Sequence, residues 1–528
     1  MPPMIDWEAL KPSNYTKYFT RNLALACGLV AISTFNYVVA FDQQGFNSTQ
    51  AMDAFDRVFG VCESEGKCAL EAYYLSLLNG LTYIGFAAGA IIGSLISARY
   101  GRRMTIFCMS IWALCTATIL VTSGVSHNKW QLLAGRILNY IYIGMELSSV
   151  PVYQSEVVPG PIRGLAVGSY QLSLGIGGLI VNSICRGTSE IKDNRSWMIP
   201  YGLYYIIPSF VASCIWFIPE SPRWLLMKER DDEALKALIT LRGRGNEVSP
   251  EEELQMIRLS LQEEQDQGTY SDLFKGHNRR RTLVVLGVAF FFQATGNSFS
   301  GHYSAVFVKS LGTINPWDVT VAQTALNTVT ALVGILLVDR IGRRKLWFFG
   351  SAFLCVFLMA TGGLGIHKPV TYTASQGIVA TMLLYQATYA ATIAPLYYTL
   401  ITEMAASRLR DKTVRLGAIV NILTIFVVSF TIPYLLDAGY ADLGSEVGFI
   451  YGSMSFLALI FGYFCIPELK GQSLEQVEKI FETGVPLRKI GQFQLDSSEM
   501  QPIGAKLGTL DSVPAEENSQ SVDPPKGH

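Results

Sequence analysis

The sequence predicts an all-α membrane protein with twelve transmembrane helices in two bundles of six. Half of its 528 residues are apolar and only 16% are charged, whereas an average soluble protein carries about 25% charged residues. Twelve hydrophobic runs reach the roughly 20 residues that a helix needs to cross a bilayer, and the two halves repeat the same charged motifs. A net charge of −1 argues against a nucleic-acid partner.

The twelve predicted spans follow one another with mostly short polar connections. They cover residues 23–43, 73–97, 105–123, 130–151, 165–185, 199–218, 282–308, 318–338, 346–366, 374–401, 414–436 and 446–466. The first 20 residues are polar and lack the apolar core of a cleavable signal peptide. The first span is therefore expected to direct its own insertion.

Basic residues indicate the orientation of the spans. They gather in the loops after the second, eighth and tenth spans, around 99–103, 339–345 and 408–415. Short loops rich in Lys and Arg stay in the cytoplasm. We therefore expect these loops and both termini to be cytoplasmic.

The two halves of the chain repeat one pattern. The triplet GRR follows the second span at 101–103 and the eighth span at 342–344, and a Pro-Glu pair closes each half. A parallel repeat of this kind predicts a substrate site between two bundles near the membrane midplane, with rocking as the motion. The expected parts are a cytoplasmic tail 1–22, a first bundle 23–219, a cytoplasmic linker with helices 220–281, a second bundle 282–467 and a cytoplasmic segment 468–528, mostly disordered after about 484.

Four motifs at these places resemble the sugar porter family of the major facilitator superfamily. They are PESPRWL (219–225), GRILNYIYIGMELSSVPVYQSEVVPGPIRG (135–164), DRIGRR (339–344) and PELKGQSLEQ (467–476). The resemblance covers about residues 23–482 and is greatest to fungal members. It implies the major facilitator fold with intracellular helices, a plasma-membrane location, and a sugar or a related polyol as substrate.

The resemblance also implies ion pairs at the cytoplasmic ends of the helices, which hold one state of the transport cycle. The matching residues are Arg102, Arg103, Glu156, Arg163, Glu220 and Arg223 in the first half and Arg343, Arg344, Glu403, Arg410 and Glu468 in the second. Ala98 stands where the first-half motif usually has Asp, while Asp339 fills the equivalent place in the second half. The alternative is that the arginines only set the topology, although topology does not require the glutamates.

Three charged residues stand out inside predicted spans, where charge is expensive and is by default a sign of function. Asp42 stands where proton-coupled sugar porters carry a protonatable Asp, and Arg136 matches the arginine that pairs with it. Glu146 follows on the same helix as Arg136, but the ten residues between them span about 15 Å, too far for a direct pair. Glu146 is a candidate second proton site or substrate contact. Asp42 could instead cap its helix among lipid headgroups.

A sugar site needs amide side chains, which donate and accept hydrogen bonds, and aromatic rings that cover the sugar's C–H faces. The resemblance points to nine candidates: Gln171, Asn182, Gln293, Asn297, Ser298, Tyr303, Asn327, Tyr398 and Asn421. Phe292 replaces an expected glutamine and His302 a tyrosine, so an ordinary glucose site is not expected. A disaccharide, another monosaccharide or a polyol all remain open, and each candidate could serve helix–helix hydrogen bonding instead.

The expected activity is proton-coupled sugar symport. A facilitative uniporter is the first alternative; a non-transporting sugar sensor is the second, disfavoured because sensors tend to have longer tails than the final 45 or so residues here. No metal, nucleotide or nucleophile motif is present, so neither an enzyme nor a cofactor other than the coupling proton is expected. One chain holds both bundles, which suffices for a monomer. Cys62 and Cys68 share one outer loop, either bridged or as free thiols.

Overall fold

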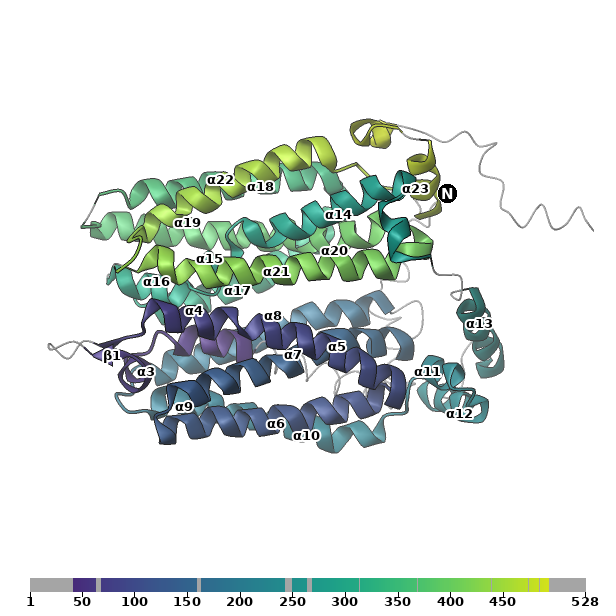
Figure 1. The fold of residues 1–528 in the computed structure, drawn as a ribbon, viewed down its shortest axis with the longest axis horizontal. Coiled ribbons are helices and arrows are strands. Elements are labelled where there is room, and N and C mark those ends of the chain that lie inside the picture. The colour runs from purple at the N-terminus through teal and green to yellow at the C-terminus, as the bar shows by residue number, and fades with distance from the viewer. Residues whose placement is uncertain are drawn as a thin grey trace, which may run out of the picture.

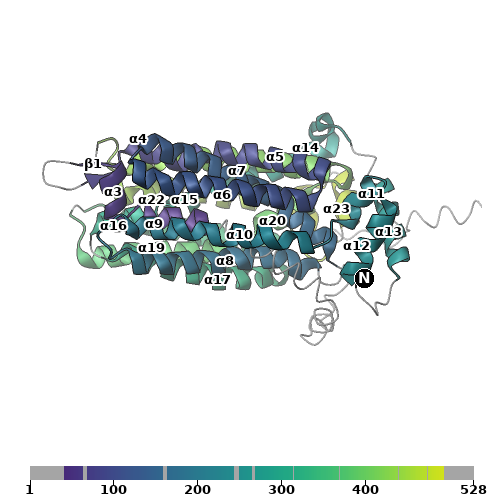
Figure 2. The same cartoon turned by 90° about the horizontal axis from the view of Figure 1, so that it is seen from below.

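Two bundles of long helices lie side by side and run along one common axis (Figures 1 and 2). The computed structural model describes residues 41–62, 68–158, 163–242, 249–263, 268–312, 314–367, 369–437, 439–472, 474–483 and 485–492. Most of the predicted first span lies outside these ranges, and its described end is helical over residues 41–49.

The first bundle contains that helix and the elements up to residue 217. The short elements at one end are α3 (Asp53–Phe59), β1 (Val61–Cys62) and β2 (Cys68–Ala69). The long helices are α4 (Ala72–Gly80), α5 (Thr82–Tyr100), α6 (Arg102–Ser126), α7 (Lys129–Val157), α8 (Arg163–Thr188), α9 (Arg195–Gly202) and α10 (Ile206–Cys214), with α4 and α5 forming one span and α9 and α10 another.

The second bundle begins after a helical linker. The linker contains α11 (Pro222–Met227), α12 (Asp231–Arg242) and α13 (Pro250–Glu263). The bundle contains α14 (Gly276–Ala294), α15 (Asn297–Ser300), α16 (Ser304–Leu311), α17 (Pro316–Ile341), α18 (Arg343–Leu364), α19 (Tyr372–Ala391), α20 (Ile393–Met404), α21 (Arg410–Leu436) and α22 (Val447–Cys465), and α23 (Leu474–Glu482) follows it.

The two ends of the molecule are chemically distinct. At one end, called the hairpin end, β1 and β2 pair antiparallel and a disulfide joins Cys62 to Cys68, so the bridged alternative is the one found. At the other end, called the linker end, α11–α13 cover the first bundle (Figure 1). There Ser249 and Glu252 exchange the two hydrogen bonds of a capping box at the start of α13.

The helices confirm a membrane-spanning fold. Within the described ranges, nine helical segments are long and apolar enough to cross a bilayer. The predicted fourth and fifth spans are α7 and α8, and α7 is less apolar because it carries Arg136 and Glu146. With residues 41–49 at the end of the first span, the twelve helices of the predicted fold are accounted for.

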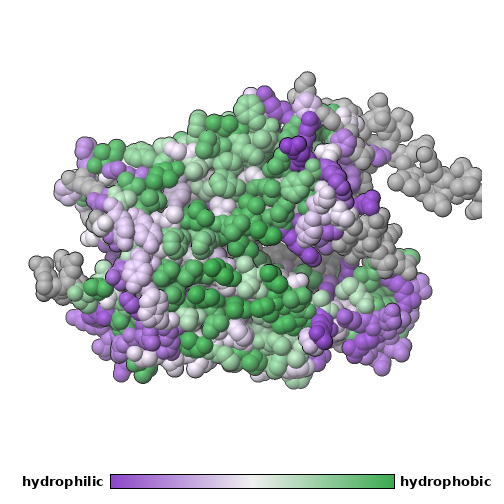
Figure 3. All heavy atoms as spheres, viewed as in Figure 1, coloured by the Kyte–Doolittle hydropathy of each residue, from purple (hydrophilic) through white to green (hydrophobic). Residues whose placement is uncertain are grey.

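The surface agrees with this placement. Hydrophobic residues form a broad band between the two polar ends (Figure 3). Ile91 and Leu95 in the middle of α5 are 63% and 65% exposed. Apolar side chains exposed over such an area are stable against lipid rather than water.

Two predicted spans are broken rather than continuous. The seventh is interrupted between α14 and α15 at Gly296, whose φ of +97° favours glycine. The tenth is interrupted at Thr392, between α19 and α20. Pro395 explains this second break, because proline has no N–H to donate to the carbonyl of Ala391 four residues earlier.

The C-terminal segment also departs from the prediction. Residues Leu487–Gln492 form a 3₁₀ helix, and the carbonyl of Arg488 accepts a hydrogen bond from Arg344 of α18. Ordered structure therefore extends beyond the predicted limit near 484, and residues after 492 lie outside the described ranges.

Close backbone contact joins α5 to α7. A Cβ added at Gly89 would lie 1.9 Å from the carbonyl oxygen of Ile141, and one at Gly144 would lie 2.0 Å from that of Phe86. Small residues of this kind let membrane helices approach until their backbones touch. The contact fixes α7, which carries the charged residues described below.

We predict that Gly89→Ala destabilises the protein, because the added methyl group forces α5 and α7 apart. Overpacking of this kind costs about 1–3 kcal/mol. The measurement is the apparent unfolding temperature of the detergent-solubilised protein. Gly363→Ala in α18 is the matched control, since its added Cβ meets nothing within 4 Å. An equal fall in both variants would contradict the packing account.

Candidate functional site

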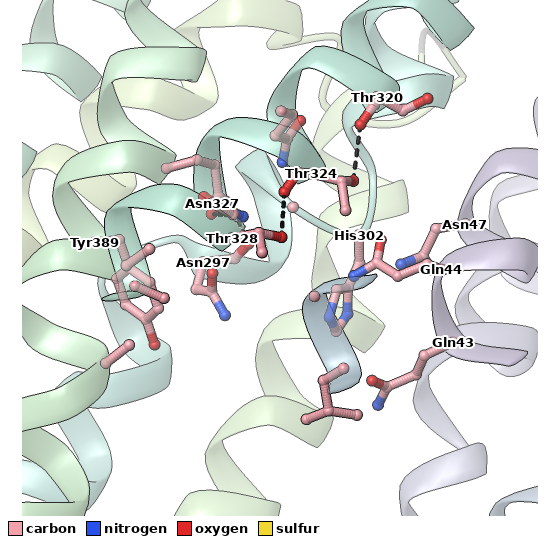
Figure 4. Close-up of a pocket in the computed structure, with 18 of the residues that line it drawn as sticks. Gln43, Gln44, Asn47, Asn297, His302, Thr320, Thr324, Asn327, Thr328 and Tyr389 are labelled. Carbon is pink, nitrogen blue, oxygen red and sulfur yellow. Dashed lines mark hydrogen bonds between the residues drawn. The ribbon is translucent and has the colours of Figure 1, made fainter. Parts of the chain in front are cut away.

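A polar cavity of about 280 Å³ lies between the bundles. The first bundle contributes residues from the helix at 41–49 and from α8, and the second contributes residues from α15–α17 and α19 (Figure 4). Its polar lining consists of Gln43, Gln44, Asn47, Ser48, Asn297, His302, Thr320, Gln323, Thr324, Asn327, Thr328, Gln386 and Tyr389. Amide groups that both donate and accept are suited to a ligand rich in hydroxyl groups.

Two of the predicted substrate residues, Asn297 and Asn327, line this cavity. The Asn327 amide donates to Oε1 of Gln386 at 3.4 Å, and Gln386 donates to the backbone carbonyl of Asn297 at 3.4 Å. Oδ1 of Asn327 is buried with no hydrogen-bond partner.

Other predicted residues lie beside the cavity and hold helices together. The Tyr303 hydroxyl is buried and donates to the Ser429 carbonyl at 2.7 Å, and Ser429 donates to Ser298 at 3.3 Å. Asn182 accepts from Ser48 at 2.6 Å and donates to Thr324 of the other bundle at 2.7 Å. These contacts assign Ser298, Tyr303 and Asn182 a place in the walls around the site.

The remaining substrate candidates are placed differently. Gln293 and Asn421 each hold a buried side-chain oxygen without a hydrogen-bond partner. The side chain of Gln171 lies outside the described residues. Tyr398 is 57% exposed although protein surrounds it, which places it against open space inside the molecule.

An aromatic cluster that includes the cavity residue Tyr389 surrounds Phe292, which stands where the resemblance leads one to expect a glutamine. The rings of Phe292 and Tyr397 stack with centroids 4.1 Å apart and planes inclined by 13°. Tyr398 meets both rings edge-on, and the Tyr389 hydroxyl donates to the Phe292 carbonyl at 2.8 Å. The loss of one amide is thus accompanied by a rigid aromatic surface.

Sequence reasoning missed several cavity residues. Gln43 and Gln44 directly follow Asp42, and Gln386 lies within an otherwise apolar span. Amides inside spans are themselves a signal, because each must find a partner in the absence of water. Which of them faces the cavity depends on helix rotation, which the sequence did not reveal.

Beside the cavity lies a buried ion pair between Asp42 and Arg136. Their side chains are each 1% exposed, and Nη1 of Arg136 lies 3.3 Å from Oδ1 of Asp42. Two further residues of α7 complete the carboxylate's partners: Asn139 donates to Oδ2, and so does the Tyr142 hydroxyl at 3.0 Å. The helix-end alternative for Asp42 among solvated headgroups does not fit this burial.

Aromatic rings pack against Arg136, and a hydrogen bond orients the amide that contacts Asp42. The guanidinium of Arg136 lies 3.6 Å from the ring centroid of Phe46 and 4.9 Å from that of Tyr140. Thr116 donates to Oδ1 of Asn139 at 2.9 Å, which turns the amide's N–H groups toward Asp42. Positions 136, 139 and 142 share one face of α7, so this spacing could have identified Asn139 and Tyr142. Glu146 is fully buried one turn beyond Tyr142.

The linker end of each bundle carries one bidentate ion pair. Arg102 donates to both carboxylate oxygens of Glu156 at 2.8 and 2.9 Å. Arg343 donates to those of Glu403 at 2.6 and 3.0 Å. Each pair joins two helices of the same bundle, α6 with α7 and α18 with α20.

At the linker end of each bundle, a second carboxylate binds the backbone of the GRR triplet. Glu220 accepts backbone N–H groups of Arg102 and Arg103 at 2.9 and 3.1 Å, and Glu468 accepts those of Arg343 and Arg344 at 2.9 and 3.3 Å. Burial raises the pKa of Glu220, and the donated N–H groups oppose that rise.

The glycine of each GRR triplet allows the second carboxylate to approach the backbone this closely. Gly101 and Gly342 have φ of +100° and +98°, and an added Cβ would lie 2.3 Å from Glu220 and 2.6 Å from Glu468. The other predicted gating residues are placed as follows. Arg163 and Asp339 have side chains outside the described residues, Arg223 lies in α11, and Nε of Arg410 is buried without a hydrogen-bond partner.

We predict that Glu156→Gln destabilises the protein, because it removes the charge that compensates the largely buried Arg102. A hydrogen-bonded charge of this kind contributes roughly 1.5–3 kcal/mol. Glu233→Gln is the matched control, since Glu233 pairs with Arg230 at 51% and 48% side-chain exposure, where a pair contributes less than about 1 kcal/mol. Thermal unfolding of both variants measures the difference, and equal losses would contradict it.

Comparison with known proteins identifies the family. Residues 27–481 match the family described as "Sugar (and other) transporter". The chain is 30% identical over 419 residues to the high glucose sensor RGT2 of Saccharomyces cerevisiae, covering 77% of this chain and 54% of that protein. It is 27% identical over 504 residues to the low-affinity glucose transporter HXT1 of the same yeast, covering 90% and 85%.

Solved structures show the same fold. The inward-open xylose transporter XylE from E. coli matches with a TM-score of 0.68 at 20% identity, covering 87% of this chain and 99% of that one. A second inward-open, partially occluded form of XylE matches with a TM-score of 0.67. The chain therefore belongs to the sugar transporter family and has the twelve-helix, two-bundle fold of the major facilitator superfamily.

Proposed function

We propose that this protein is a proton-coupled symporter that carries a hexose, a disaccharide or a related polyol by alternating access. The observation that carries the proposal is the fully buried Asp42 paired with Arg136. Charges inside a membrane bundle are costly, and Asn139 and Tyr142 of α7 both donate hydrogen bonds to the Asp42 carboxylate beside Arg136. A facilitative uniporter does not require a buried ion pair of this kind.

The chemistry of coupling follows from two opposing effects. Burial in a low-dielectric surrounding favours the neutral carboxylic acid, whereas a neighbouring arginine favours the carboxylate. Movement of Asp42 relative to Arg136 would therefore change its affinity for a proton during the cycle. The gradient contributes about 1.4 kcal/mol per pH unit, and a membrane potential adds about 2.3 kcal/mol per 100 mV for one charge.

The same helix links the proton to the substrate. Gln43 and Gln44, which follow Asp42 directly, line the cavity. The Tyr204 hydroxyl also donates to the Asp42 carbonyl at 3.3 Å, so the backbone at this point is held by the first bundle. Because Gln43 and Gln44 directly follow Asp42 on one helix, a sugar that binds either amide would also shift the position of Asp42.

The substrate class rests on the cavity lining and on the relatives. Amides and hydroxyls from both bundles suit a polyhydroxylated ligand, and the yeast and E. coli relatives are named as glucose and xylose transporters. The basic linker end favours a cytoplasmic position in a plasma-membrane protein, and the hairpin end would then lie outside. One chain supplies both walls of the cavity, so a monomer suffices.

The proposal is tested by uptake into proteoliposomes across a panel of labelled monosaccharides, disaccharides and polyols. With an inward proton gradient, accumulation above the outside concentration is expected for the substrate, and Asp42→Asn is expected to abolish it. Asp193→Asn, an exposed acid at the hairpin end, is the matched control and should leave accumulation unchanged.

Two other outcomes would replace the proposal. Equilibration that ignores both the gradient and Asp42→Asn would make the protein a uniporter. Sugar binding without uptake of any compound would favour a sensor, in line with the similarity to RGT2.

We predict that Asn327→Leu weakens sugar binding by about 10–100-fold, because an amide that lines the cavity is lost and a hydrogen bond from such a group is worth about 1–3 kcal/mol. The measurement is the sugar concentration that gives half-maximal counterflow. Thr330→Val is the matched control: it lies almost one turn along α17, and its hydroxyl donates to the Leu326 carbonyl. A similar change in both variants would contradict a direct role for Asn327.

A further inference from the structure

At the hairpin end, Lys309 and Arg186 each form ion pairs that connect the two bundles. Lys309 in α16 lies 2.7 Å from Asp53 and 2.7 Å from Asp56 in α3. Arg186 in α8 lies 2.5 Å from Asp318 in α17. Both connect parts of the chain more than 100 residues apart, one from each half.

Helix α3 is fixed to the first bundle. Phe55 and Phe59 both pack edge-on against Trp197 of α9, with ring centroids 5.5 Å apart. The disulfide between Cys62 and Cys68 closes the hairpin that follows α3 directly. The two aspartates therefore move with the first bundle as one body.

Lys309 lies instead on a segment of the second bundle in which the helix is interrupted twice. Its helix, α16, is separated from α14 by the break at Gly296 and from α15 by residues 301–303. The same stretch touches the first bundle again, since Gln50 donates to the His302 carbonyl at 3.1 Å and the Tyr83 hydroxyl lies 3.4 Å from Nδ1 of His302. A segment with these breaks can tilt without moving the rest of its bundle.

We propose that Asp53, Asp56 and Lys309 form an ion-pair gate that holds the hairpin end shut in the state described here. The inference rests on the proposed alternating-access function, because a substrate that enters from the hairpin end requires α16 to part from α3. Lys309 would release α3 in that step, and the Asp56 carboxylate would become hydrated, whereas the Asp53 side chain is already 80% exposed.

Burial makes this triad the stronger of the two connections. The Asp56 side chain is 10% exposed and that of Lys309 is 31% exposed, while Asp318 is 57% exposed and Arg186 also pairs with Glu190, just after the end of α8. Burial raises the pKa of Asp56, and the ammonium group of Lys309 opposes that rise, so the carboxylate depends on Lys309. Exposed pairs are worth little by comparison.

The small free-energy difference expected between closed and open states suits a gate rather than a permanent contact. Closing removes water from the charges, and this cost offsets most, but not all, of their attraction. Opening returns the hydration. The free energies of the two states therefore differ little, as a cycle that must visit both requires.

The test reads the opening of the hairpin end directly. Ser76 in α4 is fully buried and lies one turn before Gly80, whose added Cβ would meet Phe430 of α21 in the other bundle. Ser76→Cys therefore places a thiol at a contact between bundles that must part when this end opens. Its reaction rate with a water-soluble maleimide is measured in nanodiscs, with the rate of the protein lacking this cysteine subtracted.

Lys309→Met and Asp56→Asn are each expected to raise the labelling rate roughly fivefold or more, since loss of the ion pair favours the open state. Lys129→Met is the matched control: Lys129 pairs with Glu71 at the same end, 3.7 Å away, but within one bundle. It should change the rate less than twofold. The charge reversal Lys309→Asp with Asp56→Lys should restore slow labelling, which a merely misfolded single variant would not explain.

Labelling of Lys309→Met at the wild-type rate would overturn the gate, and so would an equal rise in Lys129→Met. The measurement uses neither a proton gradient nor transport. A failure of proton coupling at Asp42 would therefore leave its result unchanged, and a failure of the gate would leave proton-driven uptake untouched.

Discussion

The carboxylate of Asp42 and the guanidinium of Arg136 meet at 3.3 Å with almost no exposure to solvent. A buried charge that loses its partner is strongly unfavourable, so the local structure must keep the pair together or neutralise one member. The aromatic rings over Arg136 and the oriented amide of Asn139 serve the first requirement. A proton on Asp42 serves the second, and it would leave Arg136 to find other partners. Any such rearrangement acts on the helix that also contributes Gln43 and Gln44 to the cavity.

The two halves build their linker ends alike and their centres differently. At each linker end, the first arginine of the GRR triplet binds one glutamate through its guanidinium group, and backbone N–H groups of the triplet bind a second glutamate. In the centre, the first bundle supplies the ion pair, whereas the second supplies broken helices and most of the cavity wall. The repeat thus preserves the bundle ends, while in the proposed symporter the divergent centres would separate the handling of the proton from most of the contacts with the substrate. Backbone contact at Gly89 keeps α7 in place between them.

Much of the fold could be predicted from the sequence, because each span must satisfy the bilayer on its own and hydropathy records this directly. The pairing of Arg102 with Glu156 agrees with the place that the resemblance gave these residues. The breaks at Gly296 and Thr392 were not predicted, since a single glycine or proline within an apolar span need not interrupt it. Tyr303 and Ser298 were matched by register, but their hydroxyl groups bond to neighbouring helices. The contact of Lys309 with Asp56 joins residues 253 positions apart, and no local pattern marks such a pair.

The central claim is that a proton crosses the membrane with the sugar. The most direct measurement is the electrical current that a sudden rise in sugar concentration evokes from proteoliposomes on a solid-supported membrane, with equal pH on both sides. Symport predicts a transient inward positive current with each transported sugar, and no current with a sugar that does not enter. Entry of labelled sugar into the same proteoliposomes without any current would contradict the account.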